Sequence, residues 1–518
     1  MQSIHPTFQC SNIPIAALLS EPRRIHMLGI GGIGMAGLAF LLQERGHIVS
    51  GSDLQENRQT AWLREKGITI QTDVPVDVEW IIRSRAVPDS HPDVAGATMS
   101  VSWRGDVLPE LLRDRFTIAV SGTHGKTTTA AMIAQILDCG YCIGGEVVGF
   151  DGVARDGEMM VVEADESDGT VANYHPDIAV ITNIEYDHME HHESAEAFED
   201  CFKQFILNTK QTIIYCAEDP VATCLCSENP KAVPYGLEEI VEQASLYSES
   251  LCSSTRDTRS PNTGKRVPQC LPMNKSAGLH LVEQASLYPE SLCRFRTHHT
   301  LPEYGEACPT INVSFPGRHN RLNASAAFEV CRSLRSLSRR SEASLASLGC
   351  KQWKTDAEIK KSLAALLPIK RRFEIVFDGE YTVVSDYAHH PTEIRALIDT
   401  AIETLKPKRL LGVFQPHRYT RTLALGPDFP PAFQGLEKLW LLPVYAASEE
   451  PLEGGTTEDL MGHFSKDWKN RLFFFQTLEK TWQSITGELK EGDVLLIIGA
   501  GDIEQMGEWV REGGGMME

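Results

Sequence analysis

The chain has 518 residues, more than three times the length of an average domain, so we expect it to fold around several hydrophobic cores. Its 42% hydrophobic and 23% charged content is typical of a globular protein and excludes a disordered or fibrous chain. The formal net charge of −21 disfavours nucleic acid and anionic membranes as partners, because both bind cationic surfaces. No run of about 18 apolar residues and no basic secretory leader is present, which predicts a cytoplasmic protein without membrane insertion.

The chain contains 13 cysteines, an odd number, and without an export signal this favours reduced thiols over disulfides. Cys139 and Cys142 form a CxxC pair, and Cys224 and Cys226 form a CxC pair. No further pair at zinc-binding spacing accompanies either of them. A metal or redox role for these thiols is therefore disfavoured.

Residues 1–115 predict a parallel α/β domain of the Rossmann-like kind. An apolar run at 25–30 leads through a glycine-rich turn into a helical stretch at 35–42. Strand-like runs follow at 47–51 and 80–82. Alternating strands and helices are typical of a parallel sheet.

The glycine-rich turn has the spacing of a diphosphate-binding turn. Gly29, Gly31 and Gly34 follow the GxGxxG pattern, and Asp53 lies downstream. The glycines let the backbone approach a pyrophosphate at the start of the helix. The pattern fits a dinucleotide and the diphosphate of a UDP-sugar equally well, and a tight turn without a ligand is the alternative.

A second unit, expected over residues 116–367, begins with a phosphate-binding loop, which by itself fits ATP or GTP. A strand at 116–120 runs into GTHGKTT, and a helix is expected at 129–137. Such a loop cradles phosphates with backbone NH groups and the helix N-terminus. Lys126 is expected to reach the β and γ phosphates, and Thr127 a magnesium ion. The predicted phosphate-binding residues of the loop are Gly122, Thr123, His124, Gly125, Lys126, Thr127 and Thr128.

Acidic residues and a histidine follow the next two predicted strands. The strand at 159–163 ends in Glu163 and precedes an acidic run at 165–168, and the strand at 177–181 precedes TNIEYDH, which ends at His188. The carboxyl ends of parallel strands share one edge of a sheet, where ligands bind. We therefore expect Glu163 to hold magnesium and His188 to bind a second metal ion or orient the substrate. The alternative for 165–168 is a solvated loop.

Strong periodicity disappears between about residues 236 and 305, where Ser, Pro, Thr, Arg and Cys accumulate. This segment contains a direct repeat, VEQASLYSESLC at 241–252 and VEQASLYPESLC at 282–293. Two copies are too few for a solenoid, and the composition buries little apolar surface. We expect an insertion that is partly disordered, and a smaller Ser/Arg-rich insertion at about 332–350.

A third α/β unit, again Rossmann-like, is expected over residues 368–518, with strands at 382–385, 410–414, 439–442 and 494–498. The first of these strands precedes DYAHHPTE and the second precedes QPHRYTR. Arg418 and Arg421 can flank a carboxylate or a phosphoryl group with planar donors, and the alternative is a basic surface turn. Arg371 and Arg372 are interpreted either as solvated charge or as an arm over the nucleotide.

Together these motifs resemble the Mur ligase family over nearly the whole chain outside the two insertions. The stretches that carry the resemblance are HMLGIGGIGMAGLA (26–39), SGTHGKTTT (121–129), VVEADESD (161–168), TNIEYDH (182–188), PGRHNRLNASAA (316–327), RRF (371–373), DYAHHPTEI (386–394), FQPHRYTRT (414–422) and GAGDI (499–503). The resemblance implies three domains, which are a Rossmann-like UDP-sugar domain, a central P-loop ATPase with a mostly parallel sheet, and a Rossmann-like ligase domain. It also implies ATP and Mg²⁺ as cofactors. The implied reaction joins L-alanine to the lactyl carboxylate of UDP-N-acetylmuramate through an acyl phosphate, for peptidoglycan synthesis.

The resemblance further implies roles for particular residues. Those implied to act in catalysis are Lys126, His188, His389, Arg418 and Arg421. Those implied to join the phosphate loop in binding ATP are Asn320, Asn323, Arg372 and Asp386. The amino acid is implied to contact Tyr387, His389 and Arg418, and the metal ions Thr127, Glu163 and His188. The UDP-sugar is implied to contact Gly29, Gly31, Gly32, Gly34, Asp53 and Ser84.

One departure from the family pattern, and three alternative functions, remain. Where the family usually has two serines before alanine, this chain has Ser84 and Arg85, which leaves the contact with the UDP-sugar open. A related ligase branch attaches a recycled peptide to the same nucleotide sugar but lacks the VEADESD form. A nicotinamide oxidoreductase would leave the phosphate loop without a task, and the intact loop opposes a UDP-sugar sensor with a decayed ATPase. The choice among alanine, glycine and serine, and the oligomeric state, stay open.

Overall fold

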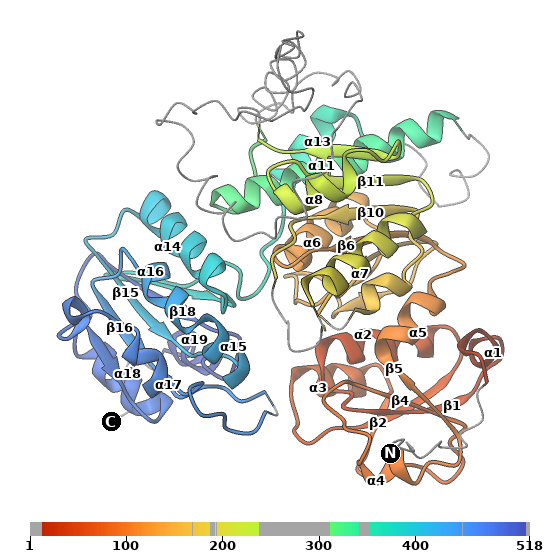
Figure 1. The fold of residues 1–518 in the computed structure, drawn as a ribbon, viewed down its shortest axis with the longest axis horizontal. Coiled ribbons are helices and arrows are strands. Elements are labelled where there is room, and N and C mark those ends of the chain that lie inside the picture. The colour runs from red at the N-terminus through yellow and green to blue at the C-terminus, as the bar shows by residue number, and fades with distance from the viewer. Residues whose placement is uncertain are drawn as a thin grey trace, which may run out of the picture.

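The structure is a computed structural model that describes residues 13–167, 169–186, 192, 194–237, 311–340, 353–447 and 449–513. Three α/β units follow one another along the chain, and each has its own sheet (Figure 1). This confirms the predicted fold class. His188 and both copies of the repeat lie outside the described residues.

The N-terminal sheet is parallel, with the strand order β3-β2-β1-β4-β5. Its strands are β1 (Arg24–Leu28), β2 (Ile48–Ser52), β3 (Thr69–Ile70), β4 (Trp80–Arg83) and β5 (Ser100–Trp103). The helices are α1 (Ile15–Leu19), α2 (Ile33–Glu44), α3 (Arg58–Glu65), α4 (Pro92–Ala95) and α5 (Arg104–Leu111). This order places the switch in chain direction between β1 and β4, where a sheet of this type binds its ligand.

The central sheet has seven strands in the order β12-β11-β10-β6-β9-β7-β8, and only the pairing of β7 with β8 is antiparallel. The strands are β6 (Phe116–Ser121), β7 (Gly140–Cys142), β8 (Ala154–Arg155), β9 (Met159–Glu163), β10 (Ile178–Ile181), β11 (Thr212–Cys216) and β12 (Ala232–Tyr235). The helices are α6 (Lys126–Leu137), η1 (Thr170–Asn173), α7 (Ala195–Asn208), α8 (Pro220–Cys226), α11 (Arg318–Arg340) and α13 (Asp356–Leu363).

The side chains of the central strands alternate between two cores, as expected for a sheet that is covered on both faces. Ile118 and Val120 pack against α6, α11 and α13, whereas Ala119 faces a core that contains α7. That second core continues without interruption into α2 of the N-terminal domain. The N-terminal and central domains are therefore held together by shared apolar packing.

The C-terminal sheet has the order β13-β14-β18-β15-β16-β17, with β13 antiparallel at the edge. The strands are β13 (Glu374–Asp378), β14 (Thr382–Asp386), β15 (Arg409–Phe414), β16 (Lys438–Leu441), β17 (Leu472–Phe474) and β18 (Asp493–Ile498). The helices are α14 (Pro391–Leu405), α15 (Tyr419–Leu425), η4 (Gly426–Asp428), α16 (Phe429–Ala432), α17 (Thr457–Gly462), η5 (Lys466–Trp468), α18 (Leu478–Thr486) and α19 (Glu504–Arg511).

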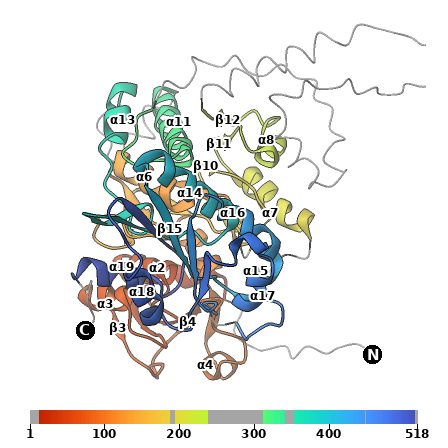
Figure 2. The ribbon, with the colours of Figure 1, turned by 90° about the vertical axis from the view of Figure 1, so that its left-hand side faces the viewer.

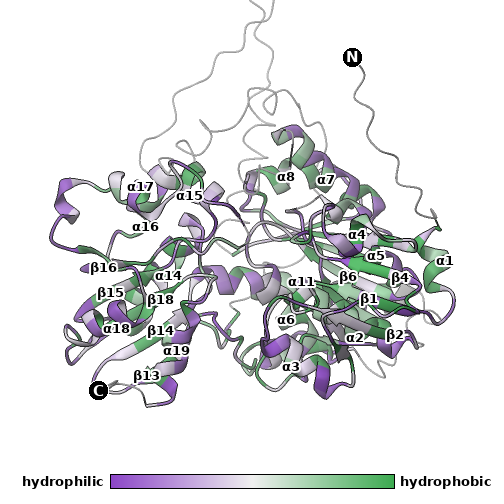
Figure 3. Ribbon diagram, turned by 90° about the horizontal axis from the view of Figure 1, so that it is seen from below, coloured by the Kyte–Doolittle hydropathy of each residue, from purple (hydrophilic) through white to green (hydrophobic). Residues whose placement is uncertain are grey.

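Two apolar cores that belong to the C-terminal domain alone cover the faces of this sheet. Figure 2 shows the domain as a separate blue unit in front of the other two, and Figure 3 shows hydrophobic residues gathered along the strands of all three sheets. Among the described helices, none is both long and apolar enough to cross a bilayer.

The predicted strands all exist, with ends that shift by at most two residues. The helix after the phosphate loop was predicted to start at residue 129, and this start was wrong because α6 begins at Lys126. Gly125, with φ of +84°, is the N-cap residue, so the loop ends there and the helix begins at the next residue. The strands that were not predicted are mostly short or lie near sheet edges, namely β3, β5, β7, β8, β11, β12, β13 and β17.

Candidate active site

The phosphate loop joins β6 to α6 at the middle of the central sheet. Gly122 has φ of +126°, and a Cβ atom there would lie 2.2 Å from Thr182 Oγ1, so only glycine fits. The Lys126 ammonium donates hydrogen bonds to the carbonyl oxygens of Gly122 at 2.7 Å and Thr123 at 3.1 Å. The loop thus surrounds the lysine at the N-terminus of α6, where anions bind.

Carboxylates keep the lysine of the loop charged. Lys126 Nζ lies 2.8 Å from Oε1 of Glu166, whose side chain is buried. Burial alone would lower the pKa of Lys126, but the charges of Glu166 and Asp165 raise it above its ordinary value. The acidic run after β9 therefore lies beside the loop, as expected for the ligand edge of the sheet, and the alternative of a merely solvated loop does not apply to Asp165 and Glu166.

Thr127 and Glu163 form a pair of oxygen ligands beside this lysine. The Thr127 hydroxyl donates to Glu163 Oε2 at 3.1 Å, and the Gly144 amide donates to Glu163 Oε1 at 2.5 Å. Burial raises the pKa of Glu163, which a nearby cation would counter. A hydroxyl and a carboxylate at the N-terminus of α6 fit a magnesium ion, which prefers oxygen ligands.

The segment after β10 fixes the shape of the loop from its other side. Asn183 Oδ1 accepts from the His124 amide at 2.8 Å, and Asn183 Nδ2 donates to the His124 carbonyl oxygen at 2.9 Å. Thr123 Oγ1 donates to the Glu185 carbonyl oxygen at 2.9 Å. The segment after β10 therefore holds the loop through hydrogen bonds that each join a side chain to the main chain. His188, the predicted second metal ligand, lies outside the described residues.

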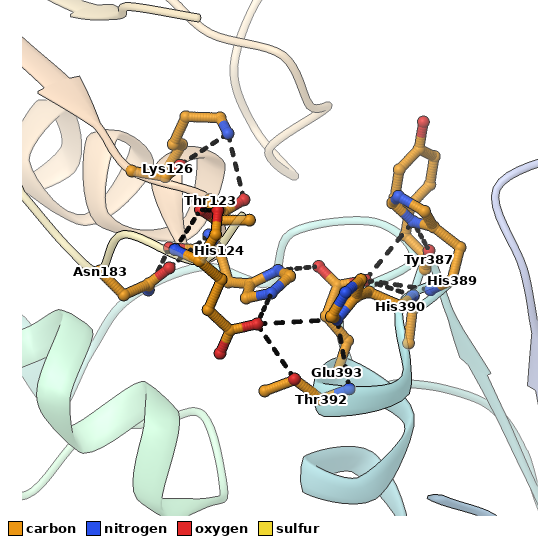
Figure 4. A network of polar contacts seen from close by, with 12 residues as sticks. Thr123, His124, Lys126, Asn183, Tyr387, His389, His390, Thr392 and Glu393 are labelled. Carbon is orange, nitrogen blue, oxygen red and sulfur yellow. Dashed lines mark hydrogen bonds and ion pairs between the residues drawn. The ribbon is translucent and has the colours of Figure 1, made fainter. Parts of the chain in front are cut away.

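A polar network links the phosphate loop to the C-terminal domain (Figure 4). The His124 ring lies between two carboxylates, with Nδ1 3.1 Å from Glu393 Oε1 and Nε2 3.0 Å from Glu185 Oε2. Thr392 Oγ1 also donates to Glu185 Oε2, at 3.1 Å. Burial alone would lower the pKa of His124, but the bonds to Glu185 and Glu393 raise it to about 10. The imidazolium therefore bridges the two domains.

The loop after β14 carries Tyr387 and His389. The His389 Nδ1 atom lies 3.0 Å from the Tyr387 carbonyl oxygen, and the two rings meet edge to face with centroids 5.4 Å apart. The guanidinium of Arg372 lies 5.2 Å from the centre of the Tyr387 ring. The structure thus brings these three predicted site residues together.

The loop after β15 carries the two predicted arginines. Arg418 is the N-cap residue of α15 and has φ of +70°, an unusual conformation for a residue other than glycine. Arg421 is buried, and its Nη1 atom lies 3.4 Å from His417 Nδ1. The His417 and His389 rings lie 5.6 Å apart, so the two C-terminal loops meet.

The predicted ATP-side residues lie close to the phosphate loop or to the domain linker. Asn320 and Asn323 are buried at the start of α11, and a Cβ atom on Gly125 would lie 2.6 Å from Asn323 Oδ1. Asp386 accepts from the backbone amides of Phe373 at 2.6 Å and Ala388 at 2.8 Å. Asp386, the last residue of β14, therefore holds the segment of Phe373 that leads into β13, in addition to any contact with a nucleotide.

The N-terminal glycine turn is held by the predicted aspartate. Gly31 donates its amide to Asp53 Oδ2 at 2.8 Å, and Gly29 has φ of +75°. A Cβ atom on Gly29 would lie 2.7 Å from Ser84 Oγ, and one on Gly34 would lie 2.7 Å from Arg104 Nη1. The turn thus needs small residues because Ser84 and Arg104 lie against its backbone.

All three domains contribute to one cavity of about 200 Å³. Its lining residues are Arg85, Trp103, Arg104 and Gly105 from the N-terminal domain, Asp165 and Ser167 from the central domain, and Arg418 from the C-terminal domain. The cavity lies between the glycine turn and the acidic run beside Lys126. A substrate bound there can contact all three domains at once.

Comparisons with known proteins agree with this geometry. The model described as "Mur ligase family, catalytic domain" matches residues 24–114, the "Mur ligase middle domain" matches 120–267, and the "Mur ligase, glutamate ligase domain" matches 371–501. The UDP-N-acetylmuramate--L-alanine ligase of Carboxydothermus hydrogenoformans is 34% identical over 93% of this chain and 95% of that protein. The enzyme of the same name from Agrobacterium fabrum is 33% identical over 93% and 94%.

The chain belongs to the Mur ligase family. Its fold agrees with the crystal structure of UDP-N-acetylmuramate-alanine ligase from Thermotoga maritima, at a TM-score of 0.67 and 24% identity over 95% of this chain and 99% of that one. A murein peptide ligase from Psychrobacter arcticus has a similar fold, at a TM-score of 0.61 and 20% identity over 96% and 99%. Mur ligases use ATP, and the phosphate loop is the predicted ATP site of this chain.

Several residues of this Mur ligase site were missed by the sequence analysis. Glu166 lies in the recognised acidic run but was given no role of its own, and Arg104 starts a helix without any motif. Glu185 and Glu393 lie inside recognised motifs, but nothing in the sequence pairs residues about 200 positions apart. Only Glu393 could have been singled out from the sequence, because His390-Pro-Thr-Glu393 has the spacing of a helix capping box.

Proposed function

We propose that this chain is an ATP-dependent ligase that joins L-alanine to the lactyl carboxylate of UDP-N-acetylmuramate. This proposal rests on the sequence identity to ligases of that name, 33–34% over 93% of the chain, together with a site to which all three domains contribute. Such a ligase must bind a nucleotide sugar, ATP and an amino acid side by side. A reaction that consumes ATP and a soluble amino acid to make a peptidoglycan precursor belongs in the cytoplasm.

The first step activates the carboxylate, which is a poor electrophile. The γ-phosphoryl group of ATP moves to an oxygen of the lactyl carboxylate, ADP leaves, and an acyl phosphate forms. The ammonium of Lys126 stabilises the negative charge that is shared between the two oxygens during this transfer. Its position within the loop, with a pKa above the ordinary value, supports this role.

Thr127 and Glu163 are the residues that would hold Mg²⁺. Their oxygens lie 3.1 Å apart beside the phosphate loop, and His188 completes the predicted set. When bound, Mg²⁺ supplies positive charge against the β and γ phosphates. The oxygens of Thr127 and Glu163 would fix the position of the ion beside Lys126 at the N-terminus of α6.

The second step forms the amide bond in the C-terminal part of the site. The neutral amine of alanine attacks the acyl carbon, and the tetrahedral oxyanion collapses by expelling phosphate. We assign the alanine carboxylate to Arg418, and the acyl phosphate to Arg421 with His389, because a planar guanidinium matches these anions. Tyr387 adds a wall beside His389. Holding both partners in one junction supplies the proximity that the step needs.

The nucleotides take positions on either side of this junction. We assign the adenosine of ATP to Asn320, Asn323, Arg372 and Asp386, and the UDP diphosphate to the turn of Gly29, Gly31, Gly32 and Gly34. Asp53 supports this turn through Gly31, and Ser84 lies against Gly29.

The test follows phosphate release from purified protein given ATP, magnesium, UDP-N-acetylmuramate and L-alanine. We expect release that requires both the nucleotide sugar and the amino acid, together with formation of UDP-N-acetylmuramoyl-alanine. Parallel reactions with glycine, serine and the recycled tripeptide measure specificity. Faster release with the tripeptide than with alanine would instead assign the chain to the peptide-recycling branch, whose fold it shares.

A further inference from the structure

Arg85 lies at the switch point of the N-terminal sheet. The order β3-β2-β1-β4-β5 leaves this point between β1 and β4, and the register pairs Leu28 with Arg83. The glycine turn that follows β1 therefore lies opposite Ser84 and Arg85, which follow β4. Ligands of such sheets bind outside the carboxyl ends of the two strands at this point.

Contacts place Arg85 beside the surface that a diphosphate would occupy. Ser84, its neighbour in the chain, lies against Gly29, and Arg104 lies against Gly34. Arg85 and Arg104 line the same cavity. The Arg85 guanidinium is 5.6 Å from the centre of the Trp103 ring, which also lines the cavity. The charged group is thus held at the cavity wall next to the glycine turn.

The charge of the cavity is positive although the whole protein carries −21. Its charged lining residues are Arg85, Arg104 and Arg418 against Asp165, and Arg104 Nη2 lies 3.9 Å from Asp165 Oδ2. Three cations and one anion leave a net charge of +2. The N-terminus of α2, which begins at Ile33 directly after the turn, adds positive potential on the same side. This combination favours an anion with more than one negative charge.

We propose that Arg85 is a substrate-positioning residue that binds the diphosphate of the nucleotide sugar. That this diphosphate belongs to UDP-N-acetylmuramate rests on the proposed function. The family pattern usually has serine where this chain has Arg85, so the arginine adds a cation and planar donors that match phosphate oxygens. It acts through binding and takes no part in the chemical steps.

The test is a binding titration with the full-length protein and two ligands, UDP and UDP-N-acetylmuramate. Arg85→Ser restores the family's residue and should weaken both ligands by about tenfold, the loss expected for a charge-assisted hydrogen bond. Arg85→Lys keeps the charge and should weaken them less. Arg113→Ser removes an exposed arginine of the same domain that pairs with Glu110, and it should bind both ligands like the wild type. ATP affinity should stay unchanged in all three variants.

Two results would overturn this role. If Arg85→Ser binds UDP as tightly as the wild type, Arg85 does not contact the diphosphate. If only the binding of UDP-N-acetylmuramate weakens, Arg85 contacts the lactyl carboxylate instead. Equal thermal unfolding midpoints of the variants exclude a folding defect as the cause. UDP binding needs no turnover, so the inference can fail while the wild type still makes product, and it can hold where the ligase assay fails.

Discussion

At the scale of single residues, the phosphate loop depends on a balance of charge around one ammonium. Lys126 lies within hydrogen-bond distance of Glu166 and two carbonyl oxygens, which hold it in place before a phosphate arrives. A buried ammonium without such partners would lose its proton, because burial disfavours the charged form. Glu166 therefore acts through Lys126, as a positioning residue.

Replacing this ammonium should remove activity and leave the fold intact. For Lys126→Ala we expect kcat to fall by at least about 1000-fold, because the charge of the phosphoryl transfer loses its main cationic partner. The measurement is phosphate release at saturating substrates, with far-ultraviolet circular dichroism as the check on folding. Lys203→Ala, which removes an exposed lysine of α7, serves as the control and should retain full activity. A Lys126→Ala protein with more than a tenth of the wild-type rate would contradict the assignment.

Motif residues could be predicted at this scale, and their partners could not. GTHGKTT identifies Lys126 and Thr127 because the loop is continuous in the chain. Glu166 and Arg104 become visible only when β9 and α5 are placed beside the loop and the glycine turn. Local patterns thus report the chemistry of a site, whereas the contacts that tune its charge come from the tertiary structure.

At the scale of elements, the start of α14 is the part of the C-terminal domain that contacts the phosphate loop. His390 caps this helix, and Glu393 in its first turn accepts from the backbone amide of His389 while its other oxygen meets His124. Burial alone would raise the pKa of Glu393, but the charge of His389 and the hydrogen bond and charge of His124 lower it well below the ordinary value. Capping and domain contact are therefore combined in one carboxylate.

This contact should give stability that depends on pH. The pKa of His124 rises from 6.5 to about 10, so its contribution is fully present below about pH 6.5 and is lost as the pH rises through about 10. We expect His124→Gln to lower the thermal unfolding midpoint at pH 6.5 and to approach the wild type near pH 10. The measurement is differential scanning calorimetry at both pH values. His175→Gln is the control, because the pKa of His175 is lowered and carries no alkaline contribution. A midpoint difference that stays constant from pH 6.5 to 10 would exclude this source of stability.

Long buried strands were predictable, and short or peripheral ones were not. Met159–Glu163 is a run of apolar residues that ends in a carboxylate, and the observed strand has the predicted ends. In contrast, β8 and β3 have two residues each, too few to produce a pattern in the sequence. The same reason explains why the alternation of strands and helices correctly indicates the fold class but leaves the sheet edges undefined.

At the scale of the whole molecule, the carboxyl ends of the three sheets supply the groups of the site. The glycine turn follows β1, the phosphate loop follows β6, and the Tyr387 and Arg418 loops follow β14 and β15. The sequence predicts each of these positions separately, because each motif follows an apolar run. It does not predict the relative placement of the sheets, which depends on the core shared by the first two domains and on polar contacts to the third.

The repeat-containing segment can be tested against this arrangement. Glu218 contacts the chain on both sides of the segment. Leu237, directly before it, donates its amide to Glu218 Oε1 at 3.0 Å, and the guanidinium of Arg318, eight residues beyond residue 310, donates to the other oxygen. Because the two flanking stretches approach the same side chain, a linker between them costs little in loop-closure entropy. Replacing residues 238–310 with a Gly/Ser linker of about ten residues should therefore keep kcat within about threefold of the wild type and leave the KM for ATP unchanged.

The informative measurement is steady-state ligase activity of the shortened protein beside a variant that lacks only residues 241–252. If the segment is an insertion without a catalytic task, both proteins follow the wild type, because every described site residue lies outside it. A loss of activity at an unchanged thermal midpoint would mean that the segment contributes to the site itself. A lowered midpoint in the shortened protein, with activity retained at low temperature, would instead show that the segment stabilises the central domain, whose strand β12 ends just before it.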